Sequence, residues 1–293
     1  MIHEVTAKTL LSSAKRPDPW FGIKYTMNLY RGCQHQCIYC DSRSECYRIE
    51  NFADVIVKVN AIDLLKKELP RKRVKGTIGT GSMSDPYLPL EATRRLTAQA
   101  LEVIAEQRFP VHVLTKSDLV LRDLDILRVI SRVYAAISFT ITTADDELGK
   151  KVEPGAPLVS RRFAAMTQLA DAGLLTGVLL MPVLPFIEDN PDNITAIVDR
   201  AQDCGASYIL ASFGMTLRDR QRAYYYAQLD RLFPGRRQQY EGQYGNRYSA
   251  AARGATRLEQ IFRETCERQG IATRLPFYEP APLPGSATQP ALF

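Results

Sequence analysis

Short apolar runs alternate with amphipathic stretches over most of the chain, and this alternation predicts the fold. The apolar runs have the length of buried strands and lie at 24–29, 77–80, 111–115, 134–142, 175–181 and 208–212. The stretches between them repeat apolar residues at helical spacing and predict helices at 61–69, 93–108, 121–133, 161–171 and from Asp192 or Asn193 onward. Such alternation is typical of a parallel sheet covered by helices. We therefore expect about six βα units, fewer than the eight of a closed barrel.

The βα rhythm ends near residue 212, and this change divides the chain into four predicted parts. Beyond it, helices are expected at 218–233 and 256–269, and the last stretch is rich in proline. The predicted parts are a lead-in at 1–23, a core of βα units at 24–214, a helical extension rich in tyrosine and arginine at 215–275, and a loose tail at 276–293.

The composition is ordinary for a globular protein. The chain has 293 residues, of which 45% are hydrophobic and 24% charged, enough for one large domain with an appendage. The N-terminal stretch lacks a sustained apolar run, and the longest apolar segment is interrupted by Pro182 and Pro185. That segment is shorter than the roughly 20 residues of a membrane span. We therefore expect no membrane association, a cytoplasmic location and reduced thiols.

The positive charge of the chain is concentrated in one segment. The net charge is +6, and the segment from 216 to 257 accounts for all of it, with nine arginines against three acids. Because arginine contacts phosphates and tyrosine stacks on unpaired bases, this segment favours a surface for nucleic acid or for a partner protein. The alternative is a helix with a buried tyrosine face and a solvated arginine face. The candidates are Arg218, Arg220, Arg222, Tyr224 and Tyr225.

Three cysteines in the run NLYRGCQHQCIYC are the clearest chemical signal. Cys33, Cys37 and Cys40 have the spacing CxxxCxxC. A [4Fe–4S] cluster used for electron transfer takes four thiolates, so three leave one iron open to bind a small molecule. Zinc held by the same cysteines and His35 is the alternative, in a structural metal-binding module, although the gaps around His35 are tighter than usual for zinc ligands.

This cysteine spacing, with Tyr39 directly before the third cysteine, resembles the radical S-adenosylmethionine (SAM) superfamily. The resemblance implies a [4Fe–4S] cluster and SAM as cofactors, with SAM chelated by the open iron. An electron from the cluster then cleaves SAM to a 5′-deoxyadenosyl radical, which abstracts hydrogen from a substrate. It also implies an α/β fold, an open partial (β/α)6 TIM-like barrel with a C-terminal helical, basic extension. A reductant protein such as flavodoxin or ferredoxin would supply the electron.

Two segments further along resemble the spore-photoproduct-lyase-like branch of this superfamily. GTGSMSDPYLPLE, after the second strand, matches a segment that lies beside the amino group of SAM, and its candidates are Ser84 and Asp85. Ser138, Thr140 and Thr142 alternate along one strand, so they share a face. In a barrel that face would point inward and place the hydroxyls near the SAM ribose and carboxylate, so Ser138 and Thr140 are candidates. The alternatives are a tight turn in the first segment and ordinary strand propensity in the second.

Two further matches complete the predicted cofactor site. Glu153 and Arg162 fit the EP…R pattern of the same group, and an arginine is suited to binding a carboxylate; the alternative is a surface ion pair. Met181, in GVLLMPVLPFIEDN, would pack beside adenine, or serve only to pack a buried strand.

The order of motifs is closest to the type called radical SAM mobile pair protein B. Members of that type are encoded beside a second radical SAM protein, which implies a heteromeric partner. The lyase donates hydrogen from an extra cysteine after the second strand, where this chain has Ser82, Met83 and Ser84, so repair of photoproducts is not expected. The expected substrate is a nucleic-acid base, with a peptide or small molecule as the alternative. An auxiliary cluster on Cys46, Cys204 and Cys266 is not expected, because free cysteine is a common core residue.

Overall fold

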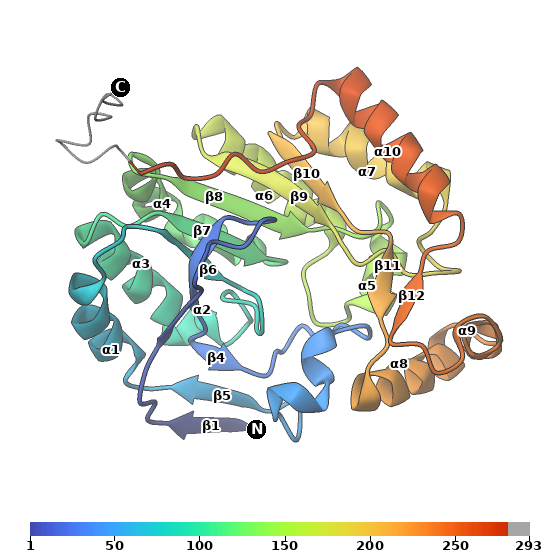
Figure 1. Ribbon diagram of the computed structural model, residues 1–293, viewed down its shortest axis with the longest axis horizontal. Coiled ribbons are helices and arrows are strands. Elements are labelled where there is room, and N and C mark those ends of the chain that lie inside the picture. Colours follow the sequence, from blue (N-terminus) through green and yellow to red (C-terminus); the bar gives the residue numbers. More distant parts are fainter. Residues whose placement is uncertain (281–293) are drawn as a thin grey trace, which may run out of the picture.

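The computed structural model describes residues 1–280, and a curved seven-stranded sheet lies at its centre (Figure 1). Six parallel strands follow one another across it in sequence order: β3 (Ile23–Met27), β6 (Thr77–Thr80), β7 (Val111–Thr115), β8 (Ala135–Thr140), β9 (Leu175–Leu180) and β10 (Tyr208–Ala211). β2 (Leu11–Ser13) pairs antiparallel with β3 and ends the sheet on that side. Since β2 and β10 do not pair among the described residues, the sheet is open.

Helices cover one face of the sheet and bury its apolar side chains (Figure 1). They are α1 (Ala61–Glu68), α3 (Leu96–Glu106), α4 (Leu124–Ser131), α6 (Val159–Asp171), α7 (Pro191–Asp203) and α10 (Ala255–Gln269). Along β8, Ile137 and Phe139 pack in the main core beneath these helices, whereas Ala136 packs with Tyr208 on the opposite face. Both faces are buried, as is usual for parallel sheets. The predicted mixed α/β fold with a parallel sheet is confirmed.

The helix expected at 93–108 is interrupted. Arg95 has a φ of 54°, in the left-handed region, and it separates α2 (Glu91–Arg94) from α3. The helix expected at 121–133 begins as a 3₁₀ turn at Asp118–Asp123 before α4. A short helix that we did not expect, α5 (Asp146–Val152), follows β8. Asp145 caps its N-terminus, since its carboxylate accepts a hydrogen bond from Leu148 N.

The C-terminal region is built differently from a simple helical extension. β11 (Gly214–Thr216) pairs antiparallel with β12 (Ser249–Ala251), and α8 (Asp219–Leu232) and α9 (Arg236–Tyr244) lie between them in sequence. The hairpin and α9 were not predicted. α9 buries only Tyr240 and Tyr244, four residues apart, so its apolar signal is weak. α10 packs against α7 and so belongs to the helical layer of the sheet.

The N-terminal lead-in also takes part in sheets. β1 (Ile2–Val5) pairs in parallel with β5 (Val55–Lys58), which pairs antiparallel with β4 (Tyr30–Arg31). This small sheet frames the segment that carries the three cysteines, because that segment connects β4 to β5. Most of the predicted C-terminal tail, 281–293, lies outside the described residues.

Candidate functional site

The cysteine loop leaves β4 through a position that only glycine can occupy. Gly32 has a φ of 78°, and a Cβ there would lie 2.1 Å from the backbone oxygen of Asp54. Beyond it, Cys33 and Cys37 are buried and Cys40 is half-buried. All three thiols line one cavity of about 760 Å³. The loop therefore gathers the three predicted ligands around a single space.

This cavity lies at the carboxyl ends of the parallel strands. Gly81 follows β6, Thr115 ends β7, Thr140 ends β8 and Met181 follows β9, and all four residues line the cavity. Residues of the β11–β12 hairpin line it as well. Ligands of open parallel sheets bind at this edge, because the strand-to-helix loops converge there.

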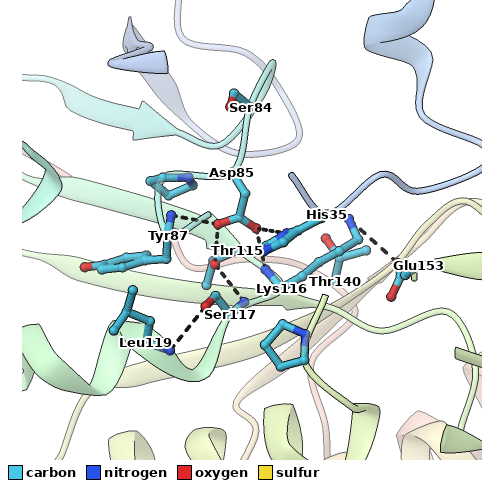
Figure 2. Close-up of polar contacts among 12 residues, drawn as sticks. His35, Ser84, Asp85, Tyr87, Thr115, Lys116, Ser117, Leu119, Thr140 and Glu153 are labelled. Carbon is cyan, nitrogen blue, oxygen red and sulfur yellow. Dashed lines mark hydrogen bonds and ion pairs between the residues drawn. The ribbon is translucent and has the colours of Figure 1, made fainter. Parts of the chain in front are cut away.

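Asp85 lines the cavity, as predicted, and connects three segments of the chain (Figure 2). Its Oδ1 accepts hydrogen bonds from Tyr87 N at 2.8 Å and Thr115 Oγ1 at 2.7 Å, and its Oδ2 accepts one from Lys116 N at 2.7 Å. His35 Nδ1 lies 3.3 Å from Oδ2. Burial favours the neutral carboxyl, but His35 and these hydrogen bonds outweigh it and hold the pKa of Asp85 at about 2. Its oxygens thus join the loop after β6 to β7 and to the cysteine loop.

A buried charge network stands on the other side of the cysteine loop. The two carboxylate oxygens of Glu153 contact the Tyr39 hydroxyl and Arg162 Nη1, and Lys116 Nζ lies 3.8 Å from Glu153 Oε1. Arg162 also donates hydrogen bonds to the backbone oxygens of Thr140 and Pro157. Burial favours neutral Glu153, but Arg162 and Lys116 outweigh it and lower its pKa. Glu153 and Arg162 therefore form a buried pair, and neither lines the cavity.

Lys116 is the cavity residue that the sequence analysis missed. Burial opposes its charged form, but the Cys37 thiolate, once formed, and the Glu153 carboxylate outweigh burial and raise the pKa of Lys116. It is therefore a cation that faces the cavity beside Cys37, suited to a carboxylate of a bound molecule. Its signal in the sequence was a charged residue placed directly after a buried strand.

Two further segments brace the cysteine loop. Val152 O, at the end of α5, accepts a hydrogen bond from Ile38 N, and Gly155 N, in the loop that follows α5, donates one to His35 O. A Cβ at Gly155 would lie 2.1 Å from Gln34 O, so the close approach of the two loops requires glycine.

The start of α8 holds the loop from the opposite side. Gln221 Nε2 donates a hydrogen bond to Tyr39 O. Asp41 accepts a hydrogen bond from the Thr216 hydroxyl and forms an ion pair with Arg218.

The arginines and tyrosines predicted to bind nucleic acid or a partner make contacts within the chain. Arg220 donates to Ile49 O and Arg222 to Leu217 O. Tyr224 stacks on Arg43, whose guanidinium carbon lies 3.6 Å from its ring centroid, and Tyr225 is buried in an aromatic cluster. This arrangement resembles the alternative interpretation, a helix with a buried tyrosine face.

The other predicted residues lie at different depths. Ser84, Thr140 and Met181 line the cavity, and Ser84 donates a hydrogen bond to Gly32 O. Ser138 lies deeper, where its hydroxyl bonds to His112 Nε2 at 2.8 Å and Tyr208 OH at 2.7 Å. It shares a face with Thr140, as predicted, but does not line the cavity.

The other three cysteines lie apart from the cavity. Cys266 is buried, Cys204 half-buried and Cys46 exposed, and none of them lines it.

The donor set at this cavity suits an iron–sulfur cluster. Burial raises the pKa of all three thiols, that of Cys33 to about 12, so they carry protons until a metal displaces them. Thiolates are the ligands that iron–sulfur clusters use. Within residues 1–280, no three His, Cys, Asp or Glu side chains are placed to hold a single metal ion.

A parallel α/β sheet with three cysteines at its carboxyl edge is the arrangement of an iron–sulfur protein that leaves one metal position open. The sequence profile of the radical SAM superfamily matches residues 27–211. The chain therefore belongs to the radical SAM superfamily, as its sequence predicted, and proteins of this superfamily use a [4Fe–4S] cluster and SAM.

Curated relatives span much of the chain. An uncharacterized protein of Mycobacterium tuberculosis is 30% identical over 240 residues, 79% of this chain and 70% of its own. An uncharacterized protein of Methanocaldococcus jannaschii is 35% identical over 191 residues, 64% of this chain and 70% of its own. A radical SAM Nα-GlyT isomerase of Pseudomonas phage M6 is 25% identical over 199 residues, 68% of this chain and 41% of the isomerase.

Among solved structures, spore photoproduct lyase complexed with a dinucleoside spore photoproduct has the same fold. The TM-score is 0.65 at 18% identity, over 91% of this chain and 79% of the lyase. The predicted likeness to the lyase thus holds for the fold. Within the described part of the chain, every helix is too short or too polar to cross a membrane.

Proposed function

We propose that this protein is an enzyme that cleaves SAM reductively and uses the resulting radical to abstract hydrogen from a substrate. The observation that carries the proposal is the cavity at the carboxyl edge of the parallel sheet, lined by Cys33, Cys37 and Cys40 together with the cation Lys116. When bound, the [4Fe–4S] cluster and SAM supply a 5′-deoxyadenosyl radical. The six parallel strands of the open sheet then act as a partial barrel around the reacting groups.

The residues of the chain have distinct tasks in this proposal. Cys33, Cys37 and Cys40 hold the cluster, and Lys116 binds the carboxylate of SAM. Asp85 and Glu153 act as positioning residues, since their oxygens already bond to neighbouring segments of the protein. Met181 and Leu179 offer apolar surface in the cavity for the adenine ring.

The proposed substrate is a nucleic-acid base. Its support is the resemblance of the SDPY…PLE and EP…R segments to the lyase-like group, together with a second cavity described below. The alternative, a peptide or small molecule presented by a second radical SAM protein, rests on the likeness to mobile pair proteins. A flavodoxin or ferredoxin is the proposed electron donor in either case.

The test is release of 5′-deoxyadenosine by anaerobically reconstituted protein reduced with dithionite. We expect release from the natural chain and none from Cys37→Ala, with Cys204→Ala as a matched control because Cys204 lies outside the cavity. Equal release from Cys37→Ala would overturn the assignment of the cluster. A protein that folds with one zinc ion and does not bind SAM would favour a structural metal-binding module instead.

A further inference from the structure

A second cavity opens where the two ends of the sheet face each other. Its wall contains Ala211 at the end of β10, Trp20 in the loop between β2 and β3, and Arg274 and Phe277 in the segment that follows α10. β10 ends the sheet on one side and β2 on the other, so the curvature of the open sheet brings these segments together (Figure 1). We call this space, of about 870 Å³, the seam cavity.

The seam cavity adjoins the cavity that contains the three cysteines. Ser212 and Phe213, directly after β10, line both spaces. In the loop before β3, Trp20 lines the seam cavity and its neighbour Phe21 lines the cysteine cavity. A chain-like ligand seated in the seam cavity could therefore place an adjacent unit beside the cysteines.

Trp20 is held in an exposed position at this cavity. It is the only tryptophan of the chain, and 48% of it is exposed. Its loop is fixed by Asp18, whose Oδ1 accepts hydrogen bonds from Trp20 N and Phe21 N, both at 2.9 Å. Phe277, 44% exposed, packs so closely on Gly22 that a Cβ there would lie 2.8 Å from its ring. The backbone that carries Trp20 and the ring of Phe277 are thus held by contacts within the chain, which lowers the entropy cost of binding.

The same cavity carries positive charge. Arg263, Arg274 and Glu259 line it, and Glu259 pairs with Arg263, so the net positive charge comes from Arg274. Arg274 forms no ion pair with any acid among residues 1–280. Guanidinium groups bind phosphates with a planar fork, and aromatic rings stack on bases. Arginine and tryptophan at one cavity therefore match the two parts of a nucleotide.

We propose that the seam cavity binds one nucleotide of a single-stranded nucleic acid, with its base stacked on Trp20 and its phosphate at Arg274. This inference rests on the proposed function, because it supplies the site that would hold a nucleic-acid substrate next to the cysteine cavity. The proposed nucleic-acid site therefore lies at the edge of the sheet and not on α8, because the α8 residues Arg220 and Arg222 contact their own chain.

The fluorescence of the single tryptophan gives a direct test. Full-length reconstituted protein is titrated with a short oligothymidylate, and with an abasic deoxyribose-phosphate oligomer of equal length. We expect saturable quenching by oligothymidylate and none by the abasic oligomer, because stacking requires a base. Equal quenching by both would overturn the assignment, and so would quenching by an acidic aromatic peptide without any by oligothymidylate.

Variants locate the site through the fluorescence anisotropy of a labelled oligothymidylate. Trp20→Leu should weaken binding about tenfold, the loss of one stacked base. Arg274→Gln should weaken it and reduce the salt dependence by about 0.7 in slope, one phosphate contact on a single strand. Tyr248→Leu and Arg268→Gln are the matched controls, since both residues are exposed and lie outside the seam cavity. Controls that lose as much affinity as the site variants would overturn the assignment.

Failure of this site and failure of the proposed function can be told apart. SAM cleavage without oligonucleotide binding at the seam would reject the site and leave the radical chemistry intact. Base-dependent quenching in a protein that never releases 5′-deoxyadenosine would support the site and reject the proposed function.

Discussion

Replacement of Arg162 by methionine should expose the energetic role of the buried charge network. The Arg162 side chain is 1% exposed, contacts Glu153 Oε2 and donates hydrogen bonds of 3.0 Å to Thr140 O and 2.8 Å to Pro157 O. Arg162→Met preserves apolar length but leaves a buried carboxylate without its main counter-charge. Breaking a buried ion pair from one side costs about 3–5 kcal/mol. Lys116 Nζ remains 3.8 Å from Glu153, so we expect the lower end, about 3 kcal/mol.

The loss in free energy of unfolding caused by Arg162→Met should also depend on pH, and this dependence is a second, independent test. In the natural protein the pKa of Glu153 is lowered, so its ionised form stabilises the fold above the unfolded pKa, and this contribution is lost as pH falls through the folded pKa. In Arg162→Met, burial dominates and the pKa of Glu153 rises. The folded variant then binds a proton before the unfolded chain does, so acidification from neutral pH should narrow the gap in stability between the two proteins.

The assay is urea denaturation of both metal-free proteins under reducing conditions, followed by circular dichroism. The double variant Glu153→Gln/Arg162→Met is the control, because it removes both charges. Its loss in free energy of unfolding should be at least about 1 kcal/mol smaller than the sum of the losses measured for Glu153→Gln and for Arg162→Met. A loss below about 1 kcal/mol for Arg162→Met, or the same loss at about pH 7 and about pH 5, would refute the reasoning.

Three further predictions concern the core, SAM and the cluster. Burial lowers the pKa of His112 to about 4, so the unfolded chain binds this proton first as the pH falls. The free energy of unfolding should therefore fall by up to about 3 kcal/mol between about pH 6.5 and about pH 4. In urea denaturation His112→Gln should show a smaller fall, and an equal fall would contradict this. Lys116→Met should weaken SAM binding about tenfold or more by calorimetry, whereas exposed Lys150→Met should not. Gly155→Ala should reduce the iron and sulfide bound per chain, because its Cβ would meet Gln34 O. Gly242→Ala is the control and should bind the full amount, since a Cβ there meets nothing within 4 Å. An equal loss in both variants would argue against support of the cysteine loop by the loop that follows α5.

Local patterns were sufficient to predict the strands and to locate the cysteine motif. Each of the six parallel strands lies within two residues of a predicted apolar run, because strands buried on both faces need continuous apolar sequence. The spacing of Cys33, Cys37 and Cys40 is a property of one loop, so it is readable without the fold. α9 and the β11–β12 hairpin were missed, because short elements with few buried residues leave little periodic signal.

The roles of individual polar residues depended on contacts that are distant in sequence. Asp85 lines the cavity, as predicted, but its sequence did not reveal that its oxygens also accept hydrogen bonds from Thr115 and Lys116, about 30 positions away. Ser138 and Thr140 share a face, but strand depth puts one beneath the cavity and the other at its wall.

The amino-acid pattern alone thus establishes a radical SAM protein with a parallel α/β sheet, because periodicity and motif spacing are local. Which residues are buried, which are paired and which meet at a cavity is decided only by the tertiary structure. It makes Glu153 and Arg162 a buried pair, directs Arg220 and Arg222 of α8 toward their own chain, and brings Trp20 and Arg274 to the wall of one cavity. The physical reason is that burial and pairing depend on which segments the curved sheet brings together, and that is a property of the whole fold.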